Sequence, residues 1–417
     1  MSNVIGLACV ICGTMYPEDF AGYVCTDHGN EGILDVRYDY ERIGATFTRE
    51  VLAENRDRTM WRYLPLMPLA SDTVVPPLSI GGTPLYDVKP LAARLGIANL
   101  WVKDEGRQPT ASLKDRASAM AVVKAQARAA EVVTTASTGN AAAALAGIAA
   151  SVGLRSVIFV PSSAPEAKIA QLLAYGSTVA LVNGTYTDAF ELCMEAVAEY
   201  GWYNRNTGYN PFMTEGKKTA GLEILEDLGW EAPDAIFVSV GDGSIIGGVH
   251  KAVKDAFALG WIDRVPRIFG IQAAGSDYLV QAFESGEDVL TKPPISAETV
   301  ADSISADLPR DRIKAMAAVT ETGGAYLRVA DDEILAAIPT LARGSGVFAE
   351  PAGAAPYAGI VAALDRGLIG AGDRVVMLAT GSGLKDVASV MSAVAAVGTE
   401  PMYIDPNLEA LKAALSN

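Results

Sequence analysis

The chain has few basic residues, few histidines and few cysteines for its length. Its 417 residues include 33 Lys and Arg against 49 Asp and Glu, which gives a net charge of −16 at pH 7, and only 2 His. This acidity argues against a nucleic-acid groove or an anionic membrane surface as the main partner. An anionic small molecule stays compatible with it, because a few local cations and backbone N–H groups suffice to bind one.

The sequence also lacks the marks of a secreted, membrane-spanning or nucleotide-binding chain. Three of the 4 cysteines lie within the first 25 residues, so there is no distributed disulfide framework, and a reducing compartment is indicated. The first residues have neither the basic region nor the long apolar stretch of a signal peptide. An apolar run at residues 141–150 is shorter than the roughly 20 residues that span a bilayer, and neither a dinucleotide fingerprint nor a Walker loop occurs. We expect a cytoplasmic protein.

Half of the residues are apolar, and they recur in short β-branched runs. A chain of this length buries one large core or two ordinary ones, so two domains are expected. Each run is followed by a turn and a helical stretch, which is typical of parallel strands joined by crossover helices. The fold class is therefore α/β, with sites at the carboxyl ends of strands. The predicted strands are residues 99–103, 131–135, 156–160, 178–182, 235–240, 267–271 and 374–378.

Three of these strands end in turns that suit a cofactor. The turn Ser137-Thr-Gly-Asn140 opens a helix, whose N–H groups and positive dipole end favour a carboxylate or phosphate. The turn Gly241-Asp-Gly-Ser244 lets backbone amides approach phosphate oxygens closely. Thr380, after the last strand, is placed to hydrogen-bond a pyridine nitrogen without protonating it. Taken alone, none of the three turns indicates a ligand site more strongly than it indicates an ordinary turn without a ligand. The order of the three turns along the chain is more specific than any one of them.

Lys114 lies where the polar segment 103–116 opens onto an alanine-rich helical run. A lysine becomes a nucleophile toward carbonyls when its ammonium is partly desolvated, and the aldehyde of pyridoxal phosphate (PLP) uses such an amine. For Lys114 alone, a solvated lysine in the first turn of a helix is the stronger alternative. The companion motifs favour the catalytic interpretation.

Together these segments resemble the threonine synthase family of fold-type II PLP enzymes, from about Leu78 onward and including the amino-terminal cysteines. Residues 210–219 and 348–355 add further matching pieces. The resemblance implies a tryptophan synthase β-like fold of two open parallel-sheet domains with helices on both faces, and a homodimer. The implied parts are a zinc-ribbon-like segment at 1–40, an amino-terminal arm at 41–77, a large PLP-binding domain at 78–117 and 211–417, and a small mobile domain at 118–210. The charge spacing of residues 41–75 predicts helix.

The resemblance also implies roles for individual residues. Lys114 would hold PLP as a Schiff base and move protons at the substrate carbons. The cofactor would further meet Asn140 at its 3′ oxygen, Thr380 at its pyridine nitrogen, and Gly241, Asp242, Gly243 and Ser244 at its phosphate. The substrate would meet Ser137, Thr138, Gly139 and Asn210. Glu350 and Pro351 would start a helix near the ring, with a structural role.

Two positions depart from the family pattern on the substrate side. Where the family typically has a threonine that touches substrate, this chain has Ala141. Where the family's Asn-Pro-x-Arg segment places an arginine on the phosphate of phosphohomoserine, this chain has Met213, and a thioether cannot replace a bidentate guanidinium. The other cations that would fill the gap are Arg116, Lys168, Lys217, Lys218 and Arg310.

The function implied by the resemblance is that of a PLP-dependent carbon–oxygen lyase, which converts O-phosphohomoserine and water to threonine and phosphate. The two departures keep a second interpretation open: an ammonia-lyase, dehydratase or β-replacing synthase for a different hydroxy-, phospho- or amino-substituted amino acid. A PLP-fold adaptor without catalysis is a remote third, and the presence of Lys114 and Asn140 counts against it.

The amino-terminal cysteines form two pairs with ribbon-like spacing, Cys9 with Cys12 and Cys25 with His28, each followed by a glycine that permits a knuckle turn. Thiolates and a neutral imidazole suit tetrahedral zinc, and four protein ligands would make the site structural. A ribbon that keeps its shape by packing and holds no metal is the alternative.

Overall fold

The computed structural model describes residues 2–137, 139–164 and 166–415, and its largest sheet has six strands in the order β12-β11-β10-β13-β5-β4. All neighbours in this sheet run parallel except β4, an antiparallel edge strand. The strands are β4 (Leu85–Asp87), β5 (Asn99–Asp104), β10 (Ala235–Ser239), β11 (Arg267–Ala273), β12 (Tyr326–Val329) and β13 (Arg374–Ala379). The β10 strand is buried along its whole length, as expected for a strand covered on both faces.

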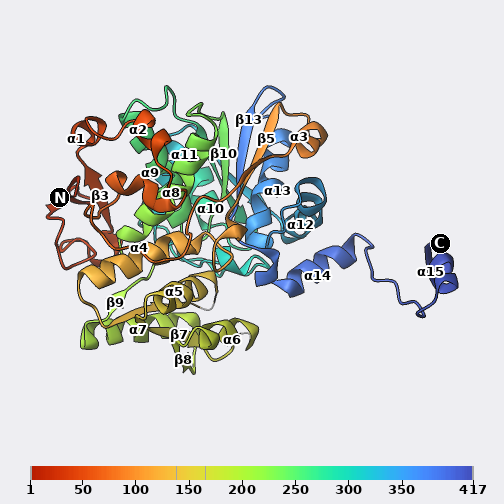
Figure 1. The fold of residues 1–417 in the computed structure, drawn as a ribbon, viewed down its shortest axis with the longest axis horizontal. Coiled ribbons are helices and arrows are strands. Elements are labelled where there is room, and N and C mark those ends of the chain that lie inside the picture. Colours follow the sequence, from red (N-terminus) through yellow and green to blue (C-terminus); the bar gives the residue numbers. More distant parts are fainter. Residues whose placement is uncertain (1, 138, 165, 416–417) are drawn as a thin grey trace.

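A second sheet has four parallel strands in the order β8-β7-β6-β9. They are β6 (Val132–Ala136), β7 (Arg155–Pro161), β8 (Thr178–Val182) and β9 (Tyr203–Asn204). Figure 1 shows this sheet and its helices below the larger sheet, with α4 (Lys114–Ala127) running between the two. The two sheets therefore approach each other where α4 begins.

All seven predicted strands are present, and the α/β prediction is confirmed. The sequence interpretation missed β4, β9 and β12, which are short. The remaining α-helices after α4 are α5 (Asn140–Ser151), α6 (Glu166–Ala174), α7 (Tyr186–Tyr200), α8 (Phe212–Asp227), α9 (Ser244–Ala258), α10 (Tyr278–Ser285), α11 (Arg312–Thr320), α12 (Asp331–Ser345), α13 (Pro351–Asp365), α14 (Val387–Ala396) and α15 (Leu408–Leu415). Within the described ranges, no helix is both long and apolar enough to cross a membrane.

Residues 4–38 contain a three-stranded antiparallel sheet in the order β2-β1-β3, with β1 (Val4–Cys9), β2 (Met15–Tyr16) and β3 (Leu34–Tyr38). The predicted helical arm at 41–75 was only partly right. It contains short helices, α1 (Tyr40–Gly44), α2 (Arg49–Glu54) and a 3-10 stretch η2 (Met60–Leu66), before α3 (Lys89–Leu95). Pro65 inside the 3-10 stretch prevents a regular helix from continuing, since it has no N–H to donate.

Candidate active site

A cavity of about 670 Å³ lies where the carboxyl ends of strands from both parallel sheets meet. Its wall includes Lys114 and residues from two of the three predicted turns, those after β6 and β10. Several sequence-predicted residues are thus brought together: Lys114, Ser137, Gly139, Asn140, Gly241, Asp242, Gly243 and Ser244. Thr138, also predicted, lies outside the described residues.

Lys114 is the first residue of α4 and is held from the turn after β13. The N–H of the preceding Leu113 donates to the carbonyl of Thr380 at 2.9 Å, and Ala111, three residues before Lys114, takes a positive φ of 65°. Burial, reinforced by the nearby Arg205, lowers the pKa of Lys114 to about 8. A substantial fraction of Lys114 is therefore an uncharged amine near neutral pH, as a nucleophile toward an aldehyde must be.

The turn after β6 presents the amino end of α5 to the cavity. Ser137 Oγ accepts from the N–H of Gly139 at 3.2 Å, which fixes the turn, and α5 begins at Asn140. The positive dipole end and free N–H groups of this helix suit a carboxylate.

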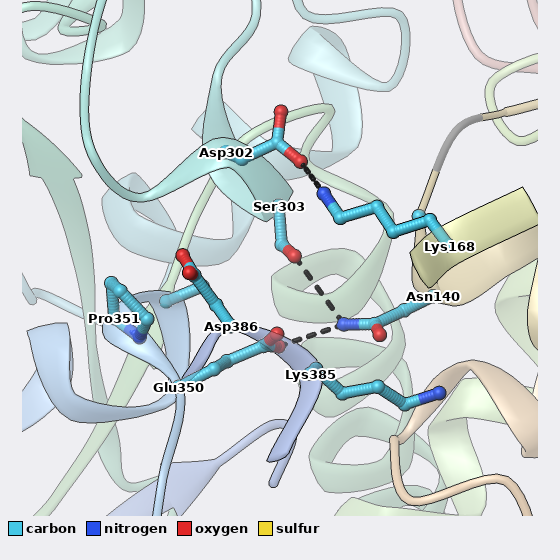
Figure 2. A pocket seen from close by; sticks show the side chains of 10 residues that line it. Asn140, Lys168, Asp302, Ser303, Glu350, Pro351, Lys385 and Asp386 are labelled. Atoms are coloured by element: carbon cyan, nitrogen blue, oxygen red, sulfur yellow. Dashed lines mark hydrogen bonds and ion pairs between the residues drawn. The ribbon is translucent and has the colours of Figure 1, made fainter. Parts of the chain in front are cut away.

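Asn140 is oriented by a carboxylate that sequence reasoning had treated as structural (Figure 2). Its Nδ2 donates to Glu350 Oε1 at 2.7 Å and to Ser303 Oγ at 3.3 Å. Glu350 is the residue before α13, as predicted, and burial raises its pKa to about 7. Glu350 therefore helps to fix the amide that the resemblance assigns to the cofactor's 3′ oxygen.

The turn after β10 has the shape of a phosphate cradle. Gly243 takes a φ of 92°, and a Cβ on Gly241 would stand 2.8 Å from the Cα of Ile304, so both positions require glycine. The helix α9 begins at Ser244, whose Oγ accepts from Lys217 Nζ at 2.7 Å. Burial and the charge of Lys114 lower the pKa of Lys217, whose hydrogen bonds go to hydroxyls alone in the described part of the chain. A buried cation at a helix amino end fits a phosphate.

Two predicted residues lie elsewhere than expected. The Nδ2 of Asn210 donates hydrogen bonds to the hydroxyl of Tyr203 at 3.1 Å and to the carbonyl of Asn204 at 2.8 Å. Asn210 is not among the described residues that line the cavity. The structure gives Asn210 a turn-forming role, because its Oδ1 also accepts from the backbone at the start of α8. Thr380 follows β13 next to the Lys114 loop, and it too is not among the described residues that line the cavity.

The cations considered as replacements for the arginine missing at position 213 fall into two groups. Arg116 and Lys218 are fully buried and bound to carboxylates, and Lys168 pairs with Asp302 across the mouth of the site. Lys217 and Arg310 line the cavity, as does Arg205, which sequence reasoning missed. Met213 is fully buried in the hydrophobic core rather than in the cavity wall.

The amino-terminal cluster brings four ligand atoms within 4.8 Å of one another, from Cys9, Cys12, Cys25 and His28. The distance between Cys12 Sγ and Cys25 Sγ is 3.9 Å, and that between Cys25 Sγ and His28 Nδ1 is 3.5 Å. A tetrahedral zinc with bonds of about 2.0–2.3 Å requires edges of roughly 3.5–3.8 Å, so the donor set fits the ion. The glycines after each pair, Gly13 and Gly29, have positive φ values of 73° and 52°.

The comparison with protein families settles the class of the chain. The family model described as "Pyridoxal-phosphate dependent enzyme" matches residues 77–381, a range that contains the cavity and its turns. The threonine synthase of Methanocaldococcus jannaschii is 37% identical over 409 residues, which cover 98% of each chain. The chain belongs to the threonine synthase family of PLP-dependent enzymes. Its cofactor is PLP, and it is an enzyme rather than a non-catalytic adaptor.

Other members and solved structures agree with this placement. The threonine synthase of Mycobacterium bovis is 35% identical over 357 residues, covering 85% of this chain and 93% of that protein. Among solved structures, the processed threonine deaminase isoform 2 of Solanum lycopersicum has a TM-score of 0.66 and 25% identity, covering 76% of this chain and 83% of that one. Maize serine racemase, with a TM-score of 0.62 and 23% identity over 76% of this chain and 92% of that one, shows the shared fold. The fold-type II prediction is confirmed.

Proposed function

We propose that this enzyme converts O-phosphohomoserine and water to threonine and phosphate. The observation that carries the proposal is one cavity that joins Lys114, with its lowered pKa, to the amino ends of two helices, α5 and α9. Two separate anion-binding positions on either side of an amine suit an amino-acid carboxylate and a cofactor phosphate. The names of the curated relatives support the same reaction.

Each group of residues in and beside the cavity would contact a different part of the cofactor or substrate. Lys114 would bind PLP covalently and, once released by substrate, move protons at the substrate α and β carbons. The amino end of α5, from Ser137 to Gly139, would hold the substrate carboxylate, and Asn140, fixed by Glu350, would bind the 3′ oxygen of the cofactor. Gly241, Asp242, Gly243, Ser244 and Lys217 would surround the cofactor phosphate, and Thr380 would face the pyridine nitrogen. PLP supplies the electron sink that stabilises a carbanion at the substrate.

The test is an assay of phosphate release and product identity with O-phosphohomoserine, beside serine, threonine and O-phosphoserine. Threonine and phosphate in equal amounts from O-phosphohomoserine are expected. Ammonia and a keto acid from serine or threonine, with no phosphate released from O-phosphohomoserine, would contradict the proposal.

A second candidate is an ammonia-lyase, dehydratase or β-replacing synthase. The observation that favours it is the position of Met213, which packs into the core where the family pattern expects an arginine on the substrate phosphate. The same assay separates the two candidates, because a lyase would release ammonia from an unphosphorylated amino acid.

We further propose that the four amino-terminal ligands hold a structural zinc ion. The support is the match between the ligand spacing and a tetrahedral site. The Cys12–Cys25 sulfur separation of 3.9 Å is far longer than a disulfide bond of about 2.05 Å, so the thiols are free to bind metal. Protein purified without chelator should contain about one zinc per chain, and metal-free protein of equal activity and stability would refute the site.

We propose that two copies form a cytoplasmic homodimer, in which residues 118–210 act as a small domain that moves relative to the rest. The support for the dimer is the segment from α14 to α15, here called the carboxyl-terminal arm, which projects from the body in Figure 1. Tyr403 is 94% exposed, and Leu408 on α15 and Met391 on α14 are more than half exposed. Apolar surface of this kind is typical of a protein–protein contact. Light scattering measures the oligomeric state directly.

A further inference from the structure

Arg205 is a buried arginine in the cavity wall, and it has no carboxylate ion-pair partner among the described residues. It follows β9 and is 1% exposed. Its Nε donates to Ser118 Oγ at 3.2 Å and its Nη1 to Thr207 Oγ1 at 2.9 Å, both neutral hydroxyls. Its Nη2 is buried and has no hydrogen-bond partner among the described residues. A guanidinium offers five N–H groups, so most of its donor capacity is unspent.

The charge around Arg205 is unbalanced. Burial lowers the pKa of Arg205 to about 10, and the charges of Tyr186, Asp242 and Asp115 offset this only in part. Lys114 and Lys217 line the same cavity, and Arg205 is among the causes that lower the pKa of each. Positive charges on these three side chains disfavour one another inside one cavity, and bound anions would relieve that repulsion.

Bound PLP would supply a partner for two of these three side chains. Lys114 would form the bond to PLP, next to the negatively charged cofactor, and Lys217 is joined to the phosphate turn through Ser244. In the described part of the chain, Arg205 makes no hydrogen bond or ion pair with residues 241–244, although the charge of Asp242 acts on it. Its two hydroxyl partners come from α4 and from the segment after β9. A second anion is therefore needed to satisfy Arg205.

We propose that Arg205 is a specificity-determining residue, which binds an oxyanion on the side chain of the amino-acid substrate in place of the arginine that this chain lacks at position 213. The proposal rests on the proposed function, since it assumes an amino acid bound at PLP. The planar fork of the guanidinium matches a phosphate or carboxylate bidentately, and the buried position strengthens the contact.

Arg310 extends the same subsite toward the cavity mouth. It lines the cavity, and its guanidinium carbon lies 4.4 Å from the centroid of the Phe190 ring, with no carboxylate within ion-pair distance in the described residues. A half-buried cation in this position attracts an incoming anion, and Arg205 receives it deeper in the cavity.

The test compares ligands that differ by one charged group. O-phosphohomoserine and homoserine are titrated against the PLP-loaded enzyme, and binding is followed by the change in cofactor absorbance. We expect the wild type to prefer the phosphorylated ligand, and Arg205→Gln to reduce that preference by roughly 10- to 100-fold, as for loss of charge-assisted hydrogen bonds. Arg205→Lys, which keeps the charge but loses the fork, should retain part of the preference. O-phosphoserine and aspartate, in further titrations, distinguish a phosphate from a carboxylate.

A matched control removes the same charge elsewhere. Arg264 pairs with Asp234 beside the amino end of β10, the end opposite the cavity, so Arg264→Gln should leave the preference unchanged. The affinity of PLP-free apoenzyme for PLP, measured by fluorescence, should also be unchanged in Arg205→Gln and Arg205→Lys.

Each other outcome overturns the proposal in a recognisable way. If Arg205→Gln or Arg205→Lys loses PLP affinity instead of ligand preference, Arg205 serves the cofactor phosphate. If the wild type binds both ligands equally, the subsite fails, and phosphate release from O-phosphohomoserine then tests the proposed function separately. If no amino acid alters the absorbance of the PLP-loaded enzyme, the proposed function fails and the subsite fails with it.

Discussion

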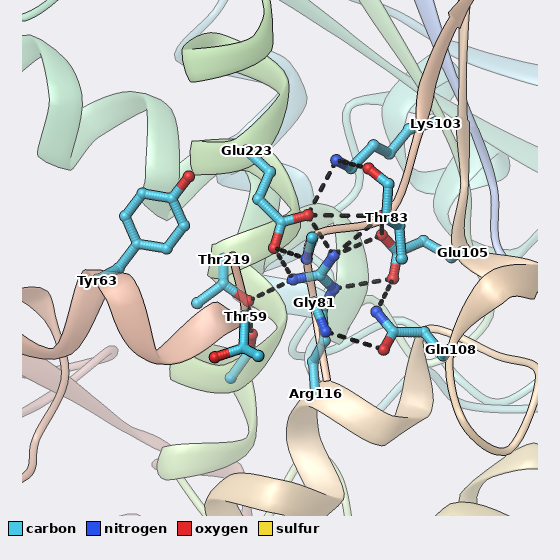
Figure 3. A network of polar contacts seen from close by, with 12 residues as sticks. Thr59, Tyr63, Gly81, Thr83, Lys103, Glu105, Gln108, Arg116, Thr219 and Glu223 are labelled. Carbon is cyan, nitrogen blue, oxygen red and sulfur yellow. Dashed lines mark hydrogen bonds and ion pairs between the residues drawn. The ribbon is translucent and has the colours of Figure 1, made fainter. Parts of the chain in front are cut away.

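Replacing Arg116 with methionine should destabilise this protein severely, because Arg116 is the centre of a fully buried ionic network (Figure 3). Its Nη2 donates to Glu105 Oε1 at 2.7 Å, its Nη1 to Glu223 Oε1 at 2.6 Å, and its Nε to Glu105 Oε2 at 2.8 Å. Lys103 Nζ lies 2.9 Å from Glu223 Oε2. Within the buried part, the two cations and two carboxylates balance, and the partly exposed Asp227 also pairs with Lys103 at 3.2 Å. The network ties α4, two residues after Lys114, to α8.

The expected loss of stability follows from the carboxylate charge that Arg116→Met leaves buried without a partner. Without Arg116, Glu105 and Glu223 share only Lys103, so one carboxylate is left buried without a countercharge. Breaking a buried pair from one side costs about 3–5 kcal/mol. We expect Arg116→Met to lie at the upper end, since both carboxylates lose bidentate contacts, and this is a large share of a typical unfolding free energy of about 5–15 kcal/mol.

Urea denaturation followed by tryptophan fluorescence measures the loss. Arg267→Met is the matched control, because Arg267 pairs with Asp373 at 3.1 Å at a partly exposed site and should contribute no more than about 1 kcal/mol. Adding Glu105→Gln to Arg116→Met removes the stranded charge, so the double variant should be less destabilised than the sum of the two single variants. A loss below about 1 kcal/mol for Arg116→Met would refute the reasoning.

Four further predictions concern the active site, the cysteine cluster and the arm. Lys114→Ala should abolish both the absorbance shift of bound PLP and turnover, whereas Lys168→Ala, at the cavity mouth, should keep the shift; an unchanged spectrum in Lys114→Ala would remove the assignment. The rate at which apoenzyme takes up PLP should rise with pH around 8, because the lowered pKa of Lys114 leaves its amine uncharged above that pH; a rise only near the ordinary lysine value of 10.5 would contradict it. Cys25→Ser should lower zinc content in metal analysis, with Cys193→Ser, a buried cysteine outside the cluster, as its control. Truncation after residue 397 should shift the protein from dimer to monomer in light scattering, and an unchanged mass would exclude the arm from the interface.

The strands were predictable because burial on both sides of a parallel sheet leaves a strong pattern in the sequence. The run at 235–240, for example, is apolar and β-branched, and β10 is buried at every residue. The strand β12 gives a weaker signal, since it has four residues and one of them is Arg328, whose side chain reaches out to Asp277. Short strands whose polar side chains find partners across the fold resemble loops in the sequence.

Arg205 was not predictable, because its importance depends on what surrounds it rather than on its own neighbours in the chain. Its sequence context, between Asn204 and Asn206, indicates a turn. Only the fold brings Ser118 and Thr207 to its guanidinium and leaves it without a carboxylate. Glu350 is a similar case, since its contact with Asn140 joins residues 210 positions apart in the chain.

Helix geometry, by contrast, explains which candidate cations reach the cavity. Successive residues of an α-helix are about 100° apart, so Arg116 points away from the face that carries Lys114, and the adjacent Lys217 and Lys218 diverge. Lys217 meets Ser244 at the cavity while Lys218 meets Asp255 in the core. Position 213 is one turn before Lys217 on the same face of α8, yet Met213 packs into the core. Since Lys217, the residue of α8 that meets the cavity through Ser244, is assigned to the cofactor phosphate, an anionic substrate needs a cation from outside α8. Arg205 is a buried residue of the cavity wall with an unpartnered Nη2 that can supply it.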